Sequence, residues 1–458
     1  MRVRQLLVKG LFAFFDHAVP LNLDDHITII HGANGLGKTA LLRLLNGFFN
    51  AKFSELETIP FSDFKLEFND GSKLNIQKST SKTKSKTNSQ RNPGGLTFSY
   101  YPRQGKIEEY HFDSERGLKD RGRLEAAIPH IVPGLERSRT NEWRYLPTGE
   151  ILSFYDVVTR FQDALVPFHG VFGGEFASQP EWLTKLRNTI DVHFIESQRL
   201  VAFNKGRSLQ GKLISEAEHS VITPSVQVYA EEITRAIRNT LTEYAELSQS
   251  LDRTFPQRLM QQNQRQSLTS DELRDKLLGL ERKRKELQAA GLLEEEQSAG
   301  FEMPENLEGT TQQVLSVYVE DVERKLGLFD TLANKIDLLK QIVDDHFLYK
   351  RMVMHREKGF LFTSQSGQPL SPTQLSSGEQ HQLVLLYELL FKVKPGSLIL
   401  IDEPEISLHV AWQQQFLKDL QQIIRLSRFD VLIATHSPQV IHDRWDLTVE
   451  LEGPVSSK

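Results

Sequence analysis

The stretch GANGLGKT, Gly32 to Thr39, constrains this chain more than any other, because it reads G-x-x-x-x-G-K-[ST], the pattern of a P-loop. The β-branched run Ile27 to Ile30 before it is typical of a buried strand, and the run Ala40 to Leu45 after it consists of good helix formers with apolar spacing. Strand, glycine-rich loop and helix in that order leave backbone N–H groups and a helix N-terminus facing an anion. The stretch therefore predicts a site for ATP or GTP.

Each part of the loop has a chemical task in such a site. The glycines let the backbone turn closely around phosphate oxygens, Lys38 is long enough to reach the β- and γ-phosphates, and the hydroxyl of Thr39 can ligate Mg²⁺. The residues expected to bind the nucleotide are Gly32, Asn34, Gly35, Gly37, Lys38 and Thr39.

Composition limits the remaining possibilities. A chain of 458 residues is long enough for two or three domains and a large core. Its net charge of -5 provides no overall positive field for nucleic acid, so any such contact needs a local basic patch. The chain has no cysteine, which excludes disulfides, thiolate metal sites and a cysteine nucleophile. We find no signal peptide and no apolar stretch long enough to span a membrane, and expect a cytoplasmic protein.

Three segments are expected along the chain. Residues 1–200 hold the P-loop and, between Phe61 and Phe112, alternating runs with turns that predict β-hairpins. The loop Thr80 to Gly95 within them is basic, and is either a solvated connector or a contact for phosphate backbones. Residues 120–190 are mixed and predicted to be helical. Residues 201–349 form a helical insertion, and residues 350–458 return to α/β character.

The helical insertion carries a heptad-like series from Leu315 to Val343, in alternating steps of four and three. Gly291 and the acidic run Glu294 to Glu296 interrupt the helical pattern and divide it into at least two arms. An antiparallel helical hairpin or short coiled coil and a plain helical bundle both fit this pattern.

The last segment holds further candidate site residues. LSSGEQ, Leu375 to Gln380, precedes an apolar helix, and its Ser and Gly are expected to leave N–H groups free for a phosphate. The apolar strand Ser397 to Ile401 ends in Asp402 and Glu403, where one carboxylate can hold Mg²⁺ and the next can orient or deprotonate water. A further strand, Asp430 to Ala434, leads to His436.

GANGLGKT, LSSGEQ, LILIDEPE and IATHS together resemble the Walker A, signature, Walker B and switch-histidine motifs of ABC-type ATPases. The DEPEISLH run, the FIESQRL run and the long helical insertion before the signature are more similar to the SMC and OLD-like branch. The resemblance implies an α/β fold: an ABC-type P-loop ATPase head with an antiparallel β subdomain and a helical or coiled-coil insertion. Among these ATPases the chain is most similar to those of bacterial anti-phage systems, with PARIS first and Septu next.

The resemblance assigns roles to individual positions. Lys38 becomes the phosphate lysine, Glu403 the catalytic base and His436 the γ-phosphate sensor, with ATP and Mg²⁺ as cofactors. The implied Mg²⁺ ligands are Thr39, Asp402 and Gln198, the last as a Q-loop glutamine that also meets the nucleotide. Ser376, Ser377 and Gly378 are the implied signature residues, which meet the nucleotide of a second protomer. Leu36 and Val410 depart from the family pattern without removing a catalytic group.

These roles imply partners and a function. A homodimer with shared ATP sites is expected, with assembly into a higher oligomer, and no membrane contact. The chain is expected to be an ATP-hydrolysing sensor or scaffold of an anti-phage system that controls a separate, TOPRIM-type nuclease effector. Residues 437–458 are too few for a nuclease domain of their own. The alternative is an SMC- or RecF-like ATPase of DNA repair that binds nucleic acid.

Overall fold

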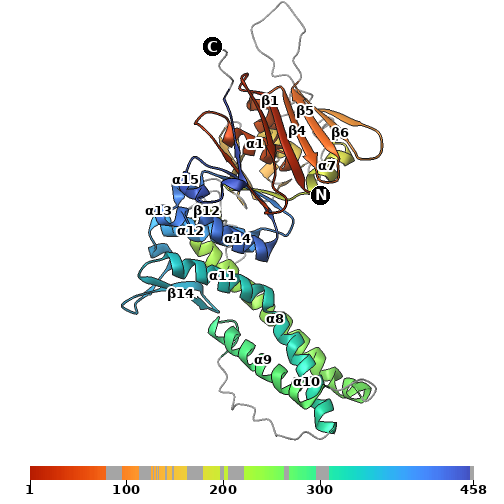
Figure 1. Ribbon diagram of the computed structural model, residues 1–458, viewed down its shortest axis with the longest axis vertical. Helices are drawn as coiled ribbons and strands as arrows, with labels where there is room; N and C mark the ends of the chain where they lie inside the picture. The colour runs from red at the N-terminus through yellow and green to blue at the C-terminus, as the bar shows by residue number, and fades with distance from the viewer. Residues whose placement is uncertain are drawn as a thin grey trace, which may run out of the picture. The chain divides into compact units, whose positions relative to one another are not determined.

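The computed structural model divides the chain into two compact units, Met1–Thr223 with Lys392–Lys458, and Pro224–Phe391 (Figure 1). The structure describes residues 1–78, 95–112, 125–126, 128–129, 131–132, 134–139, 142–146, 149–161, 179–195, 201–204, 221–262, 268–294 and 309–453.

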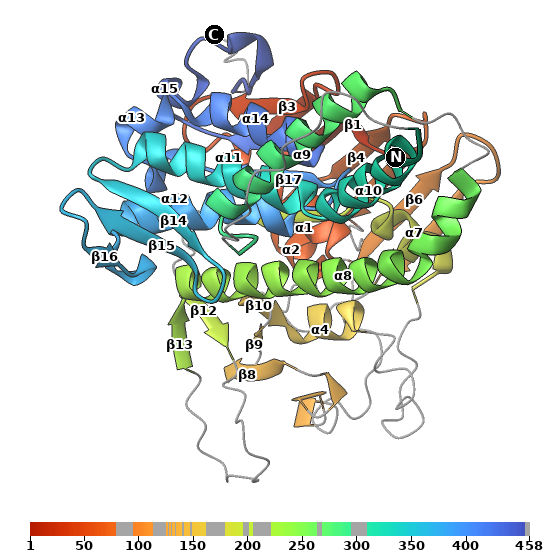
Figure 2. The same ribbon diagram turned by 90° about the horizontal axis from the view of Figure 1, so that it is seen from below.

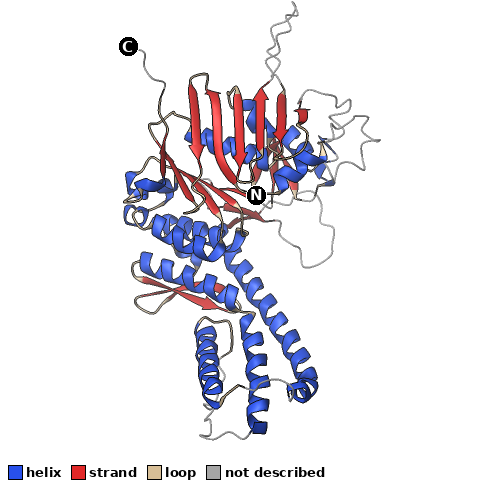
Figure 3. Ribbon diagram, turned by 45° about the vertical axis from the view of Figure 1, so that its right-hand side comes forward, coloured by secondary structure: helices blue, strands red, loops and turns tan. Residues whose placement is uncertain are grey.

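An antiparallel sheet of six strands, in the order β2-β1-β4-β5-β6-β7, forms one layer of the first unit (Figure 3). Side chains alternate along its strands, so that Phe64, Leu66 and Phe68 of β4 are buried on one face while their neighbours are partly exposed. The hairpins predicted between Phe61 and Phe112 are confirmed. The strands are β1 (Val3–Leu11), β2 (Phe15–Pro20), β4 (Asp63–Phe68), β5 (Lys73–Lys78), β6 (Leu96–Tyr101) and β7 (Glu108–Phe112).

A second sheet of the same unit is parallel throughout, with the strand order β11-β17-β18-β3-β19. Its central strands β17 and β18 are apolar except for Asp402 at the end of β17 and Asp430 at the start of β18, as in sheets that are covered on both faces. The strands are β3 (Ile27–His31), β11 (Val192–Ile195), β17 (Leu398–Asp402), β18 (Asp430–Ala434) and β19 (Thr448–Glu450).

Helix α1 (Lys38–Phe49) lies in the core that both sheets share. Leu41, Leu42, Leu44 and Leu45 are all fully buried, which shows that α1 is covered over most of its surface, although Arg43 between them is exposed. Phe48 packs against the antiparallel sheet, 6.3 Å from Phe98 between ring centroids. This burial fixes the helix whose N-terminus follows the P-loop.

Smaller elements complete the first unit. Residues 120–190, predicted to be helical, contain a three-stranded antiparallel sheet, so that prediction is wrong in part; the buried Trp143 anchors this sheet. The elements are β8 (Leu135–Arg139), β9 (Glu142–Tyr145), β10 (Glu150–Ser153), β12 (Val201–Asn204), β13 (Val221–Pro224), α2 (Phe53–Thr58), α4 (Phe154–Arg160), α7 (Glu181–Asn188), α13 (Val410–Gln413), α14 (Phe416–Ser427), α15 (Pro438–Ile441), η4 (Pro404–Ser407) and η5 (Trp445–Leu447).

The second unit contains long helices, of which α8 runs as one continuous element in Figure 2. Helix α10 packs against both α8 and α9, and Arg258 of α8 forms a bidentate ion pair with Asp321 of α10. One helix with two partners makes a small bundle rather than a two-helix coiled coil. None of the helices among the described residues is both long and apolar enough to cross a membrane. The helices are α8 (Ser225–Gln262), α9 (Ser270–Ala289), α10 (Gly309–Gly327) and α11 (Asp330–His346).

The same unit ends in a three-stranded antiparallel sheet and the helix of the signature motif. The elements are β14 (Lys350–His355), β15 (Gly359–Ser364), β16 (Pro369–Leu370), η2 (Pro372–Gln374), α12 (Ser377–Tyr387) and the π-helical turn η3 (Glu388–Lys392). The predicted fold class, α/β with an antiparallel β subdomain and a helical insertion, is confirmed. The predicted domain boundaries at residues 200 and 349 stay a prediction, since the two compact units group the chain by packing.

Candidate functional site

Three neighbouring strands of the parallel sheet carry the candidate site. The P-loop follows β3, Asp402 ends β17, and His436 comes shortly after β18. In the sheet β17 pairs with β18 and β18 pairs with β3. Because the carboxyl ends of parallel strands meet at one edge, motifs that are hundreds of residues apart in the sequence converge there.

The P-loop backbone has the conformation that its glycines allow. Gly32, Gly35 and Gly37 have φ angles of 142°, 84° and 90°, in the region that favours glycine. A Cβ atom on Gly35 would have no neighbour within 4 Å, whereas one on Gly37 would lie 2.5 Å from Cδ2 of Leu11. The nitrogen Nε2 of the buried His17 lies 2.8 Å from the carbonyl oxygen of Leu36, and this contact ties the loop to strand β2.

Lys38 is the first residue of α1 and is almost fully buried, with 4% of its surface exposed. Its Nζ donates to the carbonyl oxygens of Gly32, at 2.8 Å, and Ala33, at 3.0 Å, and lies 3.2 Å from Nδ1 of His436. Burial lowers the pKa of Lys38 below its ordinary value, although three nearby carboxylates oppose that change. Lys38 is thus held by the backbone of its own loop and by His436.

Two carboxylates of β17 and the turn after it complete this arrangement. The hydroxyl of Thr39 donates to Oδ1 of Asp402 at 3.0 Å. Oε1 of Glu403 lies 3.6 Å from Nε2 of His436. Glu403 has a left-handed backbone, with φ of 46°, and its N–H donates to the carbonyl oxygen of Ala434 on β18. An unfavourable backbone conformation for a non-glycine residue, held by a neighbouring strand, is typical of functional sites.

The sequence reasoning missed Glu405, which also belongs to this cluster. Its Oε1 accepts a 2.7 Å hydrogen bond from the backbone N–H of His436, and its charge acts on Lys38. The available signal was its place in DEPE: a third carboxylate in the turn that follows a strand of the site.

The residues present fit the cofactors that the motifs imply. Gly37 is the N-cap of α1 and provides no side-chain cap, so the first N–H groups of the helix have no capping acceptor and suit a phosphate. A hydroxyl beside a carboxylate, as in Thr39 and Asp402, is the oxygen set that holds Mg²⁺ together with nucleotide phosphates. No group of three or more His, Cys, Asp or Glu side chains among the described residues could hold a metal without such help.

Other predicted residues belong to the other compact unit or lie outside the described residues. Ser376, Ser377 and Gly378 belong to the second compact unit, at the N-terminus of α12. Gln198 and all but the last residue of the basic loop Thr80 to Gly95 lie outside the described residues. The structure therefore brings together Lys38, Thr39, Asp402, Glu403 and His436, and the catalytic and binding roles of all candidate residues stay predictions.

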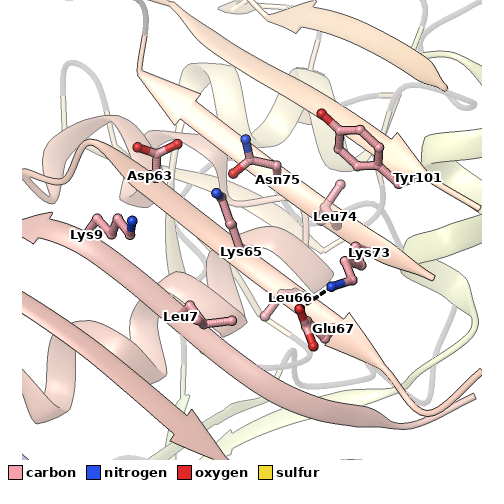
Figure 4. Close-up of a pocket in the computed structure, with 10 residues that line it drawn as sticks. All are labelled: Leu7, Lys9, Asp63, Lys65, Leu66, Glu67, Lys73, Leu74, Asn75 and Tyr101. Carbon is pink, nitrogen blue, oxygen red and sulfur yellow. Dashed lines mark hydrogen bonds and ion pairs between the residues drawn. The ribbon is translucent and has the colours of Figure 1, made fainter. Parts of the chain in front are cut away.

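A hollow of 390 Å³ lies on the face of the antiparallel sheet that carries Asp63, Lys65 and Glu67 (Figure 4). Its polar side chains carry both signs: Lys73 pairs with Glu67 at 2.6 Å, and Asp63 accepts from Gln77 at the same distance. Charges that are paired across neighbouring strands are typical of a solvated sheet face. The hollow is not a competing candidate for the chemistry.

Comparisons with known proteins agree with a nucleotide site. The chain is 30% identical to the "Retron Ec83 probable ATPase" of Escherichia coli over 105 residues. That match spans 20% of this chain and 19% of the relative, so the chain covers about a fifth of the relative's length.

Solved SMC heads are also similar, at a low level. The Smc head domain of Pyrococcus furiosus, bound to the C-terminal domain of ScpA, matches with a TM-score of 0.33 and 12% identity, over 96% of this chain and 91% of that one. The SMC head domain of Thermotoga maritima matches with a TM-score of 0.33 and 10% identity, over the same shares of the two chains. A TM-score this low does not establish a common fold, and the fold described above follows from the strand order.

A family model decides the classification. The model described as "AAA domain, putative AbiEii toxin, Type IV TA system" matches residues 204–442, which is more than half of the chain. This range includes Asp402, Glu403 and His436, while the P-loop lies before it. With the P-loop motif, the converging carboxylates and this match, the chain belongs to that family of AAA-domain proteins and is a P-loop ATPase by family.

Proposed function

We propose that this chain binds and hydrolyses ATP as the sensor or scaffold of an anti-phage defence system, in which the ATP state controls a separate nuclease. The observation that carries the proposal is the convergence of Lys38, Asp402 and Glu403 at one edge of the parallel sheet. The toxin-antitoxin wording of the family and the retron relative support a defence role. Within that class, the motif resemblance favours a PARIS-type ATPase, with a Septu-type ATPase next.

The side chains of the site have separate roles in the proposed hydrolysis. A protonated Lys38 can only donate hydrogen bonds, so Nδ1 of His436 accepts one from Nζ, and Nε2 carries the ring hydrogen toward Glu403. When a phosphate arrives, the ammonium of Lys38 can turn to it, since its present partners are neutral. Glu403 is then the group that takes a proton from the attacking water.

Thr39 and Asp402 would hold Mg²⁺, which neutralises charge on the phosphates when it is bound. Ser376 at the start of α12 would meet the nucleotide of a second copy, as the motif resemblance implies. The proposed assembly is accordingly a homodimer with two shared ATP sites, within a larger oligomer that holds a TOPRIM-type nuclease. If the nuclease binds the ATP-bound and the ATP-free states of the oligomer with different affinities, the ATP state would determine whether the nuclease is held or released.

The test is to purify the chain alone and with the products of neighbouring genes, and to measure Mg²⁺-dependent ATP hydrolysis, native mass and nuclease activity. Hydrolysis by the chain alone, with DNA or RNA cleavage only after a partner is added, is the expected result. Absence of hydrolysis in every preparation would contradict the proposal. ATP-dependent, salt-sensitive binding of duplex DNA without a nuclease partner would favour a DNA-repair ATPase instead.

A further inference from the structure

We propose that Glu405 is a positioning residue of the site, which fixes the switch histidine through its main chain. Glu405 lies in the short helix η4, and its Oε1 accepts the backbone N–H of His436 at 2.7 Å. His436 follows the end of β18, where the ladder no longer provides a partner for that N–H. The inference rests on the proposed function, because it assumes that His436 serves ATP hydrolysis.

The placement of the carboxylate distinguishes Glu405 from an ordinary surface acid. Its second oxygen, Oε2, is buried and has no hydrogen-bond partner in the part of the chain that the structure describes. Leaving a buried carboxylate oxygen unpaired costs free energy, which the nearby positive charge of Lys38 offsets. A carboxylate that only needed solvent would point both oxygens outward.

The segment that carries Glu405 is itself fixed. Pro404 begins η4, a position that suits proline, and the N–H of Ile406 donates to the carbonyl oxygen of Glu403 at 3.1 Å. The amide of Gln413 donates to the carbonyl oxygen of Glu405 at 3.2 Å, and its Oε1 accepts the hydroxyl of Ser437 at 2.8 Å. The two successive residues His436 and Ser437, which follow β18, are thus both hydrogen-bonded to the segment after β17.

The consequence concerns the imidazole of His436. Its two nitrogens lie 3.2 Å from Nζ of Lys38 and 3.6 Å from Oε1 of Glu403, so a small movement of its main chain would change both distances. Glu405 touches neither the phosphates nor the attacking water in this scheme. It acts through His436, and removal of its carboxylate is therefore expected to lower kcat and to leave the KM for ATP nearly unchanged.

The experiment compares Glu405→Ala with Glu405→Gln, and uses Asp443→Ala as the control. Glu405→Ala should lower kcat about ten- to a hundredfold, the effect of a lost hydrogen bond to a charged group, with KM within about threefold. Glu405→Gln keeps an oxygen that can accept the His436 N–H, and should recover about tenfold of that loss. Asp443 is an exposed carboxylate seven residues after His436 in the sequence, and its removal should leave kcat unchanged.

A double mutant separates action through His436 from general damage. In the His436→Ala background, Glu405→Ala should lower kcat by less than about twofold, because the side chain that Glu405 positions is already absent. Equal losses in Glu405→Ala and Glu405→Gln, or full additivity with His436→Ala, would overturn the inference.

A measurement without ATP keeps the inference independent of the proposed function. Amide hydrogen exchange at His436 should be slow in the wild type and in Glu405→Gln, and faster in Glu405→Ala. Unchanged exchange in a folded Glu405→Ala protein would show that the bond does not fix the loop. Failure of the wild type to hydrolyse ATP, with the exchange result as expected, would contradict the proposed function alone.

Discussion

The N-termini of α1 and α12 carry the two glycine-containing motifs of this chain, and they are built in opposite ways. Helix α1 begins after Gly37 with no side-chain cap, and its first residue is the cation Lys38, followed by the hydroxyl of Thr39. Helix α12 begins after Ser376 with a complete capping box: Ser376 accepts from the N–H of Glu379, and the carboxylate of Glu379 accepts from both the N–H and the hydroxyl of Ser376.

The difference shows that a similar sequence signal can leave a helix start open or closed. The expectation that Ser and Gly free the first N–H groups of α12 is wrong for the N–H of Glu379, because a local capping box satisfies it. A carboxylate at this position would also repel a phosphate. Lys350 of β14 counters that charge with contacts of 2.6 and 2.8 Å to the two oxygens of Glu379. The N-terminus of α12 is thus closed by its own cap, and the charges of Glu379 and Lys350 nearly cancel there.

The largest effect of a substitution is expected at the open site, the uncapped N-terminus of α1 with the carboxylates beside it. Glu403→Gln should lower ATP hydrolysis by about 10²- to 10⁴-fold, because the amide cannot take a proton, while nucleotide binding and the ATP-bound dimer persist. Lys38→Ala should abolish both binding and the dimer. Hydrolysis rates and native mass with ATP distinguish the two, with the exposed Glu450→Gln as control. Wild-type hydrolysis by Glu403→Gln would show that Glu403 is not the base.

The next effect concerns the backbone of the open site. Gly37→Ala places a Cβ atom at φ of 90° and 2.5 Å from Leu11, whose flexible end would have to move. We expect a loss of stability of about 1–3 kcal/mol and weaker ATP binding, measured by thermal unfolding with and without Mg-ATP. Gly396→Ala is the matched control, because its φ of 82° carries similar strain without a neighbour within 4 Å. Equal ATP affinity of the two variants would contradict this prediction, because it would show that the P-loop backbone accommodates the added Cβ atom.

The two helix N-termini differ in how far their structure could be predicted from local sequence, because part of it depends on long-range packing. The P-loop was predictable because strand, loop and helix are contiguous, and all three are found as expected. The contact of Thr39 with Asp402 was predictable only as a motif role, since its geometry depends on the order of β17, β18 and β3. The ion pair of Lys350 and Glu379 could not be predicted, because residues 29 positions apart form no local sequence pattern. The predicted role of Gln198 stays untested, since this residue lies outside the described residues.

Short strands were missed for a related reason. The strand Leu135–Arg139 buries only its first residue and is otherwise polar, so periodicity cannot distinguish it from a loop or a helix. The heptad-like series from Leu315 to Val343 correctly marked buried positions such as Val319 and Ile336, but it runs across the boundary between α10 and α11. Apolar spacing predicts which face is buried, and does not predict where a helix ends.

A smaller effect is expected at the closed site. Lys350→Ala should leave the carboxylate of Glu379 without its cation and destabilise the protein by about 1–2 kcal/mol, whereas Lys350→Arg should retain most of the stability. The exposed Lys358→Ala is the control. The contacts from Lys350 and Ser376 hold the pKa of Glu379 below its ordinary value, against the effect of burial. Its contribution is therefore present above the ordinary pKa of Glu and lost as the pH falls, and urea unfolding of wild type and Lys350→Ala should converge in acid.

The smallest effect distinguishes a cap from a ligand. Ser376→Ala removes one acceptor for the N–H of Glu379 and one donor to its carboxylate, which should cost about 1 kcal/mol of stability. Ser371→Ala is a matched control, since Ser371 forms the same kind of capping box with Gln374 at the start of η2. If Ser376 serves only as a cap, the two variants should lose similar stability and both should keep the ATP-dependent dimer that Glu403→Gln accumulates. If its hydroxyl also meets the nucleotide of a second copy, as we propose, only Ser376→Ala should lose that dimer. Native mass measured in the Glu403→Gln background decides between the two, because hydrolysis cannot then remove the ligand during the measurement.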